Sequence, residues 1–459
     1  MSVRFTPRSA VALVLALGCA VSLGMNLPGH LSYDSILQLW QGRSGVYNTW
    51  HPPVMAWLLG LGDALVPGAS LFVVLDTLLL YGALAALLLL PGRPSWLAIP
   101  VALLWAASPQ GLIYPGIVWK DVLYAGATVC GFVVLAFAAA RWHVGAHARV
   151  GLSCAALALW TLAALARQNG LVALVCGVAA LGWIAGRDMA LARVRRGLAV
   201  AGGALLASLL VIAAATAAFN AHSDGEPARL HQVEDLQAYD LAAAVRTDPG
   251  FRMGLLARRE PDLERLIRTH GAAEYSPVRI DSLAADQALQ AATQDGPPEL
   301  LAGQWRDLVL QHPGLYLKIR LTALRWVFLT PDVRTCVPIF VGVTGPQPWM
   351  DKLHIAERES RRDHALRVYS APLMDSPIFS HAAFALAALA LLAILLRRRA
   401  PADVAMVAMI SSALLFAATF LVLSVACDYR YLYALDVSSV AGALYLALTR
   451  GWRPSAGRL

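Results

Sequence analysis

The chain contains apolar runs long enough to cross a lipid bilayer, and these runs constrain its fold more than any other feature. A hydrocarbon core of about 30 Å needs roughly 20 apolar residues in a helix. The candidate spans are 10–26, 69–90, 95–111, 121–140, 150–166, 170–186, 197–219, 378–396, 401–426 and 432–449. Composition agrees, because 58% of the 459 residues are apolar and 14% are charged, against about 25% charged in soluble domains. A water-soluble or disordered chain is excluded.

Basic residues predict how these ten spans are oriented. Loops on the cytoplasmic side carry an excess of Lys and Arg. With the N-terminus in the cytoplasm, the cytoplasmic loops and tail hold Arg93, Arg141, Arg149, Arg187, Arg193, Arg195, Arg196, Arg397, Arg398, Arg399, Arg450, Arg453 and Arg458. The short outer loops then hold Arg43, Lys120, Arg167 and Arg430. We therefore expect an all-α polytopic membrane protein with about ten transmembrane helices and both termini cytoplasmic. The first span resembles an uncleaved signal anchor.

Two polar segments, 27–68 and 220–377, are expected to face outward. The chain then divides into a transmembrane module at 1–219, a periplasmic and mainly α-helical domain at 220–377, and a three-span module at 378–459.

Two shorter stretches are predicted to lie along the membrane surface. The stretch 54–66 is too short to cross, and 313–330 carries Lys318, Arg320 and Arg325. A span with three charges would be costly, so an interfacial helix is favoured.

The net charge of +8 follows mostly from the topology. We find no basic stripe with interleaved aromatic residues, so no nucleic-acid partner is expected. The six cysteines show no metal-binding spacing. Cys336 and Cys427 both fall on the outer side, where a disulfide is possible, but the sequence gives no geometry for it.

Polar residues gather at the outer ends of the predicted spans. They form the groups Asp34, Lys120-Asp121, Arg167 and Asp428-Tyr429-Arg430-Tyr431. Carboxylates at such a boundary serve as general bases or metal ligands, and Lys and Arg complement phosphate. The aromatic neighbours Tyr33, Trp50, Trp119, Tyr429 and Tyr431 suit a sugar face or anchor the membrane interface. Solvated helix caps are the alternative reading of the charges.

The order of these motifs resembles the GT-C glycosyltransferase superfamily, in the branch that includes protein O-mannosyltransferases and lipid A aminoarabinose transferases. The matching elements are Asp34 after the first span, His51-Pro52-Pro53 before an outer helix, and Lys120-Asp121 opening a later span. The loop 428–433 is similar to an (E/D)xRYxY element of some bacterial members. Two departures stand out, because many members have Lys where His51 stands, and Asp34 has no adjacent acidic residue.

The resemblance implies an inner-membrane enzyme that uses a polyprenyl-phosphate sugar donor at the periplasmic face. Asp34 matches the first acidic residue, the candidate base, and Asp121 the second, which orients the acceptor or a metal. From charge and side alone, Lys120 and Arg430 are our candidates for neutralising the phosphate. His51, Tyr33, Arg167, Asp428 and Tyr431 complete the predicted substrate site. No cofactor is certain; a divalent metal ion stays open.

The predicted reaction is inverting transfer of a sugar to a periplasmic glycan or lipid acceptor, with membrane lipids as further partners. A transporter or flippase of a lipid-linked glycan is one alternative, and a glycan polymerase is another. A transporter should have charged or broken helices near the bilayer midplane, whereas here the charged residues other than Asp76 gather at the outer boundary. That carboxylate either lines a cavity or forms a structural hydrogen bond.

Overall fold

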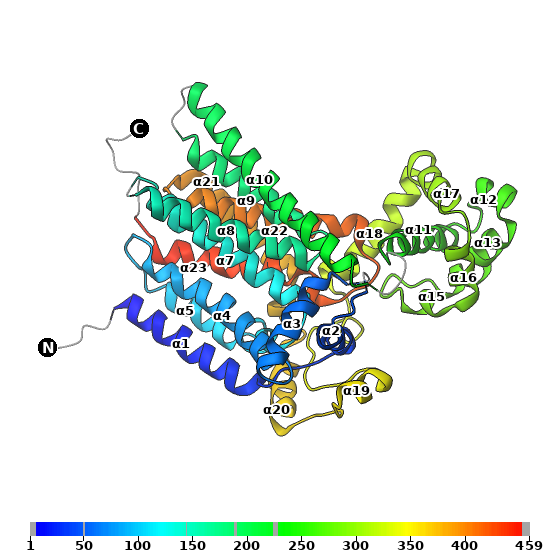
Figure 1. Ribbon diagram of the computed structural model, residues 1–459, viewed down its shortest axis with the longest axis horizontal. Coiled ribbons are helices and arrows are strands. Elements are labelled where there is room, and N and C mark those ends of the chain that lie inside the picture. The colour runs from blue at the N-terminus through cyan, green and yellow to red at the C-terminus, as the bar shows by residue number, and fades with distance from the viewer. Residues whose placement is uncertain (1–5, 49–50, 144, 188–190, 224–227, 452–459) are drawn as a thin grey trace.

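The computed structural model describes residues 6–48, 51–143, 145–187, 191–223 and 228–451. Within these ranges the chain forms helices joined by loops, with isolated β-bridges and no extended strand. A large helical bundle carries short helices against one end, and a smaller helical domain lies beyond that end (Figure 1). The expected all-α architecture is confirmed.

The bundle contains a helix at each of the ten predicted spans. These are α1 (Pro7–Asn26), α4 (Ser70–Ala86), α5 (Ala98–Ala107), α7 (Lys120–Ala140), α8 (Ala146–Ala166), α9 (Leu171–Ala185), α10 (Leu191–Asn220), α21 (His381–Arg398), α22 (Asp403–Leu423) and α23 (Tyr433–Leu448). In the described part of the chain, eight helical stretches are long and apolar enough to cross a membrane, whereas α5 and α9 are shorter. The protein is a multi-pass membrane protein, and the count of ten crossings stays a prediction.

Arginines mark one end of the bundle, which we call the arginine end. Arg8, at the start of α1, donates hydrogen bonds to the carbonyls of Leu90 and Gly92 at 2.9 and 3.0 Å. The neighbouring Arg93 N–H donates to the carbonyl of Arg450, just after α23. The start of α1 and the end of α23 therefore lie at the same end, which requires an even number of crossings.

The short helix α9 runs between the same two ends as the long ones. It begins after Arg167 and ends before Arg187, whose guanidinium donates to the carbonyl of Pro401 at the arginine end. Fifteen residues at 1.5 Å each give about 22 Å. α5 is similar, because it continues through α6 (Pro109–Leu112) to a carbonyl that binds Asn26 at the far end of α1.

The end opposite the arginines is the site end, where short helices pack across the bundle. They are α2 (Tyr33–Ser44), α3 (Pro53–Leu65), η2 (Tyr114–Gly116), α19 (Gln347–Leu353), α20 (Arg361–Ser370) and η6 (Tyr429–Leu432). α2 begins at Ser32, which forms a capping box with Ser35. It lies closely on α3, because a Cβ on Gly42 or Gly60 would collide with the backbone of the other helix.

The helical domain has a hydrophobic core of its own. It comprises α11 (Ala228–Thr247), α12 (Gly254–Arg259), α13 (Pro261–Leu266), η3 (Ile267–Gly271), α14 (Ala272–Glu274), α15 (Asp281–Ala285), α16 (Gln287–Asp295), α17 (Pro298–Gln311) and the first half of α18 (Pro313–Leu329). Core residues include Tyr239, Leu256 and Leu308, whereas Val343 and Leu366 belong to the core of the bundle. The predicted segment 220–377 thus contributes to two cores.

The predicted interfacial helix 313–330 corresponds to α18, which joins the two cores. Ile319 packs in the domain and Val327 in the bundle. Arg320 is fully buried between them, where it pairs with Asp240 at 2.5 Å and donates to the carbonyl of Ser424 at 2.7 Å. One of the three charges that argued against a span is therefore neutralised inside the protein.

Candidate functional site

A small network of hydrogen bonds around His30, which we call the His30 network, positions the acidic residues. His30 N–H donates to the carbonyl of Gly116, and Val118 N–H donates back to the carbonyl of His30. Ser35 Oγ donates to the carbonyl of Val118 at 2.6 Å, and Trp119 Nε1 donates to Ser32 Oγ at 2.9 Å. The first turn of α2 is thereby fixed beside the first turn of α7. These two turns carry Asp34 and Asp121 respectively.

Asp34 faces Arg430 and His51. Its Oδ2 accepts from Arg430 Nη2 at 2.9 Å, and its Oδ1 lies 3.5 Å from His51 Nε2. Burial alone would raise the pKa of Asp34, but the charge of Arg430, the bond to His51 and the charge of Lys120 hold it well below its usual value. The side chain is 25% exposed. Asp34 is therefore an ionised carboxylate that solvent can reach.

His51 connects Asp34 to Lys120. Lys120 Nζ lies 3.0 Å from His51 Nδ1. An ionised carboxylate only accepts, so His51 Nε2 carries the ring proton toward Asp34 and Nδ1 accepts from Lys120. Burial and the nearby Lys120 lower the pKa of His51, which keeps the imidazole neutral near pH 7.

Asp121 is buried, whereas Asp34 is accessible to solvent. Its side chain is 2% exposed and forms an ion pair with Arg167, from the loop between α8 and α9. The Arg167 guanidinium lies 5.4 Å from the ring centre of Phe416 and 5.4 Å from that of Tyr431. Such cation–π contacts hold the charge in place. Asp121 and Arg167 form the buried wall of the site.

Arg430 is the centre of the arrangement. It binds Asp34 and Asp428 at 2.9 Å each, and its Nε lies 3.8 Å from Asp121. Its guanidinium also lies 4.7 Å from the centre of the Trp119 ring. We call the set Asp34, His51, Lys120, Asp121, Arg167, Asp428 and Arg430 the outer cluster. It brings together residues predicted from four separate outer segments; their roles in a reaction stay predictions.

The remaining predicted site residues differ in placement. Tyr431 borders Arg167 and Arg430, with its ring centre 5.8 Å from the Arg430 guanidinium. Tyr33 precedes Asp34 on α2 and is 61% exposed. Trp50 lies outside the described residues.

The expectation that Tyr429 offers its ring to a sugar or the membrane interface is wrong. The side chain is fully buried, and its hydroxyl donates to Asp436 at 2.7 Å and accepts from Gln110 at 2.9 Å. Asp436 also binds His381 at 2.9 Å. This buried network holds the residue just before Arg430 and was missed in the sequence. An ionisable residue inside a predicted span, as Asp436 is, was the available signal.

The structural hydrogen bond considered for Asp76 is not formed within the part of the chain that the structure describes. Asp76 is fully buried in α4, and neither carboxylate oxygen has a hydrogen-bond partner among the described residues.

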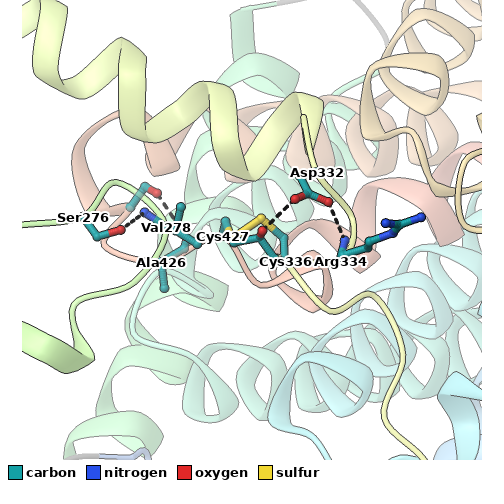
Figure 2. The surroundings of a disulfide bond; sticks show 9 residues. Ser276, Val278, Asp332, Arg334, Cys336, Ala426 and Cys427 are labelled. Carbon is teal, nitrogen blue, oxygen red and sulfur yellow. Dashed lines mark hydrogen bonds between the residues drawn. A yellow bond between two sulfur atoms is a disulfide. The ribbon is translucent and has the colours of Figure 1, made fainter.

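A disulfide joins the loop of the outer cluster to the segment after α18. Cys336 and Cys427 are bonded, with Cα atoms 5.2 Å apart. Figure 2 shows this bond, and beside it the Cys427 N–H that donates to the carbonyl of Val278 in the helical domain. The loop that carries Asp428 and Arg430 is thus fixed to both.

The outer cluster does not fit a divalent metal ion. Among the described residues, no group of three His, Cys, Asp or Glu side chains is arranged to hold one. The three carboxylates that could supply oxygen ligands, Asp34, Asp121 and Asp428, instead surround Arg430. A metal at their centre would compete with the guanidinium, so no step proposed below uses one.

Comparison with known proteins gives structural similarities only. No family model and no curated protein sequence matches the chain. Two solved structures of the oligosaccharyltransferase from Archaeoglobus fulgidus are similar, both with 14% identity: one with Zn and sulfate at a TM-score of 0.42, and one with an inhibitory peptide and a dolichol-phosphate at 0.43. They cover 94% and 95% of this chain, which spans about half the length of that protein.

ArnT from Cupriavidus metallidurans is also similar in its apo state. The identity is 17%, the TM-score 0.35, and the match covers 96% of this chain and 77% of ArnT. Because every TM-score is below 0.5, the functional proposal rests on the residues of this chain.

Proposed function

We propose that the protein is a GT-C-type membrane glycosyltransferase that transfers a sugar from a polyprenyl-phosphate carrier to a glycan or lipid acceptor. The observation that carries the proposal is the outer cluster, where an accessible carboxylate lies against cations suited to a phosphate. Asp34 meets Arg430 at 2.9 Å, and Lys120 is one histidine away. The motif order that resembles the superfamily supports the same reading.

The proposed reaction is a single displacement with inversion at the anomeric carbon. The acceptor hydroxyl attacks this carbon while Asp34 takes its proton, and the bond from carbon to the phosphate oxygen breaks. Arg430 and Lys120 receive the charge that develops on the departing lipid phosphate. Fixed cations facing a leaving group supply a large share of such catalysis.

The same cations explain how a weakly basic Asp34 could act as a base. Arg430 and Lys120 hold its pKa far below the usual value. When the carrier phosphate shares Arg430 and Lys120, their hold on Asp34 weakens and its pKa rises. Donor binding would therefore activate the base, and Asp121, which is paired with Arg167, would keep Arg430 in position.

We further propose that the site end faces the periplasm of a bacterial inner membrane. The arginine end then lies in the cytoplasm, as the distribution of basic residues predicts. The bond between Cys336 and Cys427 lies at the site end, and disulfides persist in oxidising compartments. Both observations support the same orientation.

The test uses purified protein in nanodiscs with a panel of labelled polyprenyl-phosphate sugars and glycan or lipid acceptors. We expect the release of polyprenyl phosphate together with labelled product. Asp34→Asn should abolish transfer while leaving the folded yield unchanged. Asp262→Asn, at an exposed carboxylate of the helical domain, is the matched control.

Other outcomes would replace the proposal. Movement of lipid-linked sugar across the bilayer without bond cleavage would identify a flippase. Turnover only with lipid-diphosphate-linked repeats would identify a polymerase. Full activity of Asp34→Asn would remove the assigned base.

A further inference from the structure

One face of α18 is exposed along its whole length. The exposed residues recur at a spacing of three and four, and they are Gly314, Leu317, Lys318, Leu321, Thr322 and Arg325. They line a shallow groove of about 440 Å³, which we call the α18 groove. The opposite face is buried through Ile319, Ala323 and Val327. Because that face is committed to the two cores, the α18 groove is the side available to a ligand.

The α18 groove lies where the bundle meets the helical domain. The helix contacts α22 and η6 at the site end of the bundle as well as α11 in the domain, and it connects the two bodies in Figure 1. α22 is a candidate membrane span. Leu317 and Leu321 in the groove are 49% and 48% exposed. These exposed apolar side chains lie on a helix that contacts a candidate membrane span, which suits them to the outer part of a lipid layer.

The charges of the groove are of one sign. Lys318 and Arg325 point to the exposed side, and neither forms an ion pair with any residue that the structure describes. They are seven residues apart, which is two helical turns or about 10.5 Å. Arg320, on the buried side, is by contrast neutralised by Asp240. The groove thus combines two cations without a counter-ion and two leucines.

We propose that the α18 groove binds an anionic membrane phospholipid. The lipid phosphate lies between Lys318 and Arg325, and an acyl chain follows Leu317 and Leu321. Lys and Arg side chains extend their charged ends to headgroups while their stems cover apolar surface. A zwitterionic lipid brings its own cation and gains less from the two charges, whereas inorganic phosphate brings no chain for the leucines.

The experiment measures lipid binding to the delipidated, full-length protein in detergent by native mass spectrometry. Phosphatidylglycerol, phosphatidylcholine and inorganic phosphate are the probes. In Lys318→Gln/Arg325→Gln we expect one bound phosphatidylglycerol to be lost and its affinity to fall by about ten-fold or more. Arg258→Gln/Arg259→Gln, which removes two exposed charges from α12, should bind as the unchanged protein does.

A second pair of substitutions tests the apolar half of the groove. Leu317→Ser/Leu321→Ser keeps both cations and should also weaken phosphatidylglycerol, which keeps the test independent of one variant's folding. Undiminished binding in both double variants would overturn the proposal. Equal affinity for phosphatidylcholine, equal competition by inorganic phosphate, or an equal loss in the α12 control would overturn it as well.

Discussion

The bundle has an arginine–aspartate ion pair at each end, and the two pairs are built differently. At the arginine end, Arg398 binds Asp403, five residues away. Tyr445 and the Ala400 N–H also donate to Asp403, and Arg398 donates to Thr449. Arg398 and Asp403 are close in sequence, and neighbouring groups of the protein satisfy their hydrogen bonds.

At the site end, Arg430 is shared among carboxylates from distant parts of the chain. Asp34 is 396 residues away in sequence and 25% exposed. Asp121 and Asp428 bind the same guanidinium. An ion pair whose groups are satisfied by each other and their neighbours stabilises a helix junction. A cation that shares several carboxylates, two of them accessible, can exchange one of them for a ligand. The comparison predicts stability effects at one end and activity effects at the other.

The largest effect is expected for Arg430→Lys. An ammonium keeps the charge but lacks the planar fork of donors that contacts several carboxylates. Turnover of the polyprenyl-phosphate donor should fall about 10³-fold, or roughly 4 kcal/mol. Initial rates in nanodiscs give the measurement. The matched change Arg398→Lys should leave the rate per folded molecule nearly unchanged, and an equal loss there would remove the distinction between the two ends.

The next effect concerns Asp403→Asn. Removing one partner of a buried pair leaves an uncompensated charge on Arg398, so we expect a loss of about 3 kcal/mol in stability. Thermal unfolding in detergent should show a lower midpoint than for Asp34→Asn, because Asp34 is partly exposed and Arg430 retains Asp121 and Asp428. The reverse order of midpoints would contradict the comparison.

We expect the stability of the protein to depend on pH through the His30 network. His30 accepts the Gly342 N–H at Nδ1 and donates from Nε2 to Asn26. Burial lowers the pKa of His30 to about 4, with Asp363 opposing and Arg358 and Arg362 adding to the shift. Between pH 4 and 6.5 the unfolded chain binds more protons, so stability rises with pH by about 3 kcal/mol across this window.

Unfolding midpoints measured across this pH range provide the check. His30→Asn removes the ring and should flatten the slope, apart from the contribution of the same sign from His51. His354→Asn, at an exposed loop position, is the control. An unchanged slope of the unfolding midpoint against pH in His30→Asn would show that the His30 network does not depend on a neutral His30.

The smallest effect is expected for Tyr429→Phe. The change removes one donor to Asp436 and leaves His381 in place, at a cost of about 1 kcal/mol. We expect turnover to fall by less than about ten-fold because Arg430 keeps its three carboxylates. Steady-state rates compared with those of Arg430→Lys provide the measurement. A loss as large as that of Arg430→Lys would mean that the network positions Arg430 more strongly than its own ion pairs do.

Much of the fold was predictable because crossing a bilayer requires long apolar helices. All ten predicted spans are helices, and the polar residues between them, including Asp34, Asp121 and Arg430, fall at one end of the bundle. Side-chain direction was not predictable in the same way. Tyr429 and Tyr431 are two residues apart, yet one is buried in the core and the other borders the cluster. Both residues lie in a short 3₁₀ turn, which determines the directions of their side chains. No periodic pattern in the sequence predicts such a turn.

The sequence by itself determined that the chain is an α-helical membrane protein and which end of the bundle collects the isolated charges. The length of an apolar run and the distribution of arginines are local properties of the sequence. They act directly, because a span must match the thickness of the hydrocarbon core and basic loops stay on the cytoplasmic side. Only the tertiary structure decided that Arg430 takes the centre between Asp34 and Asp121, and that Arg320 is buried while Lys318 and Arg325 are exposed. These outcomes depend on how distant helices pack, because a buried charge is tolerated only where a partner from elsewhere in the chain meets it.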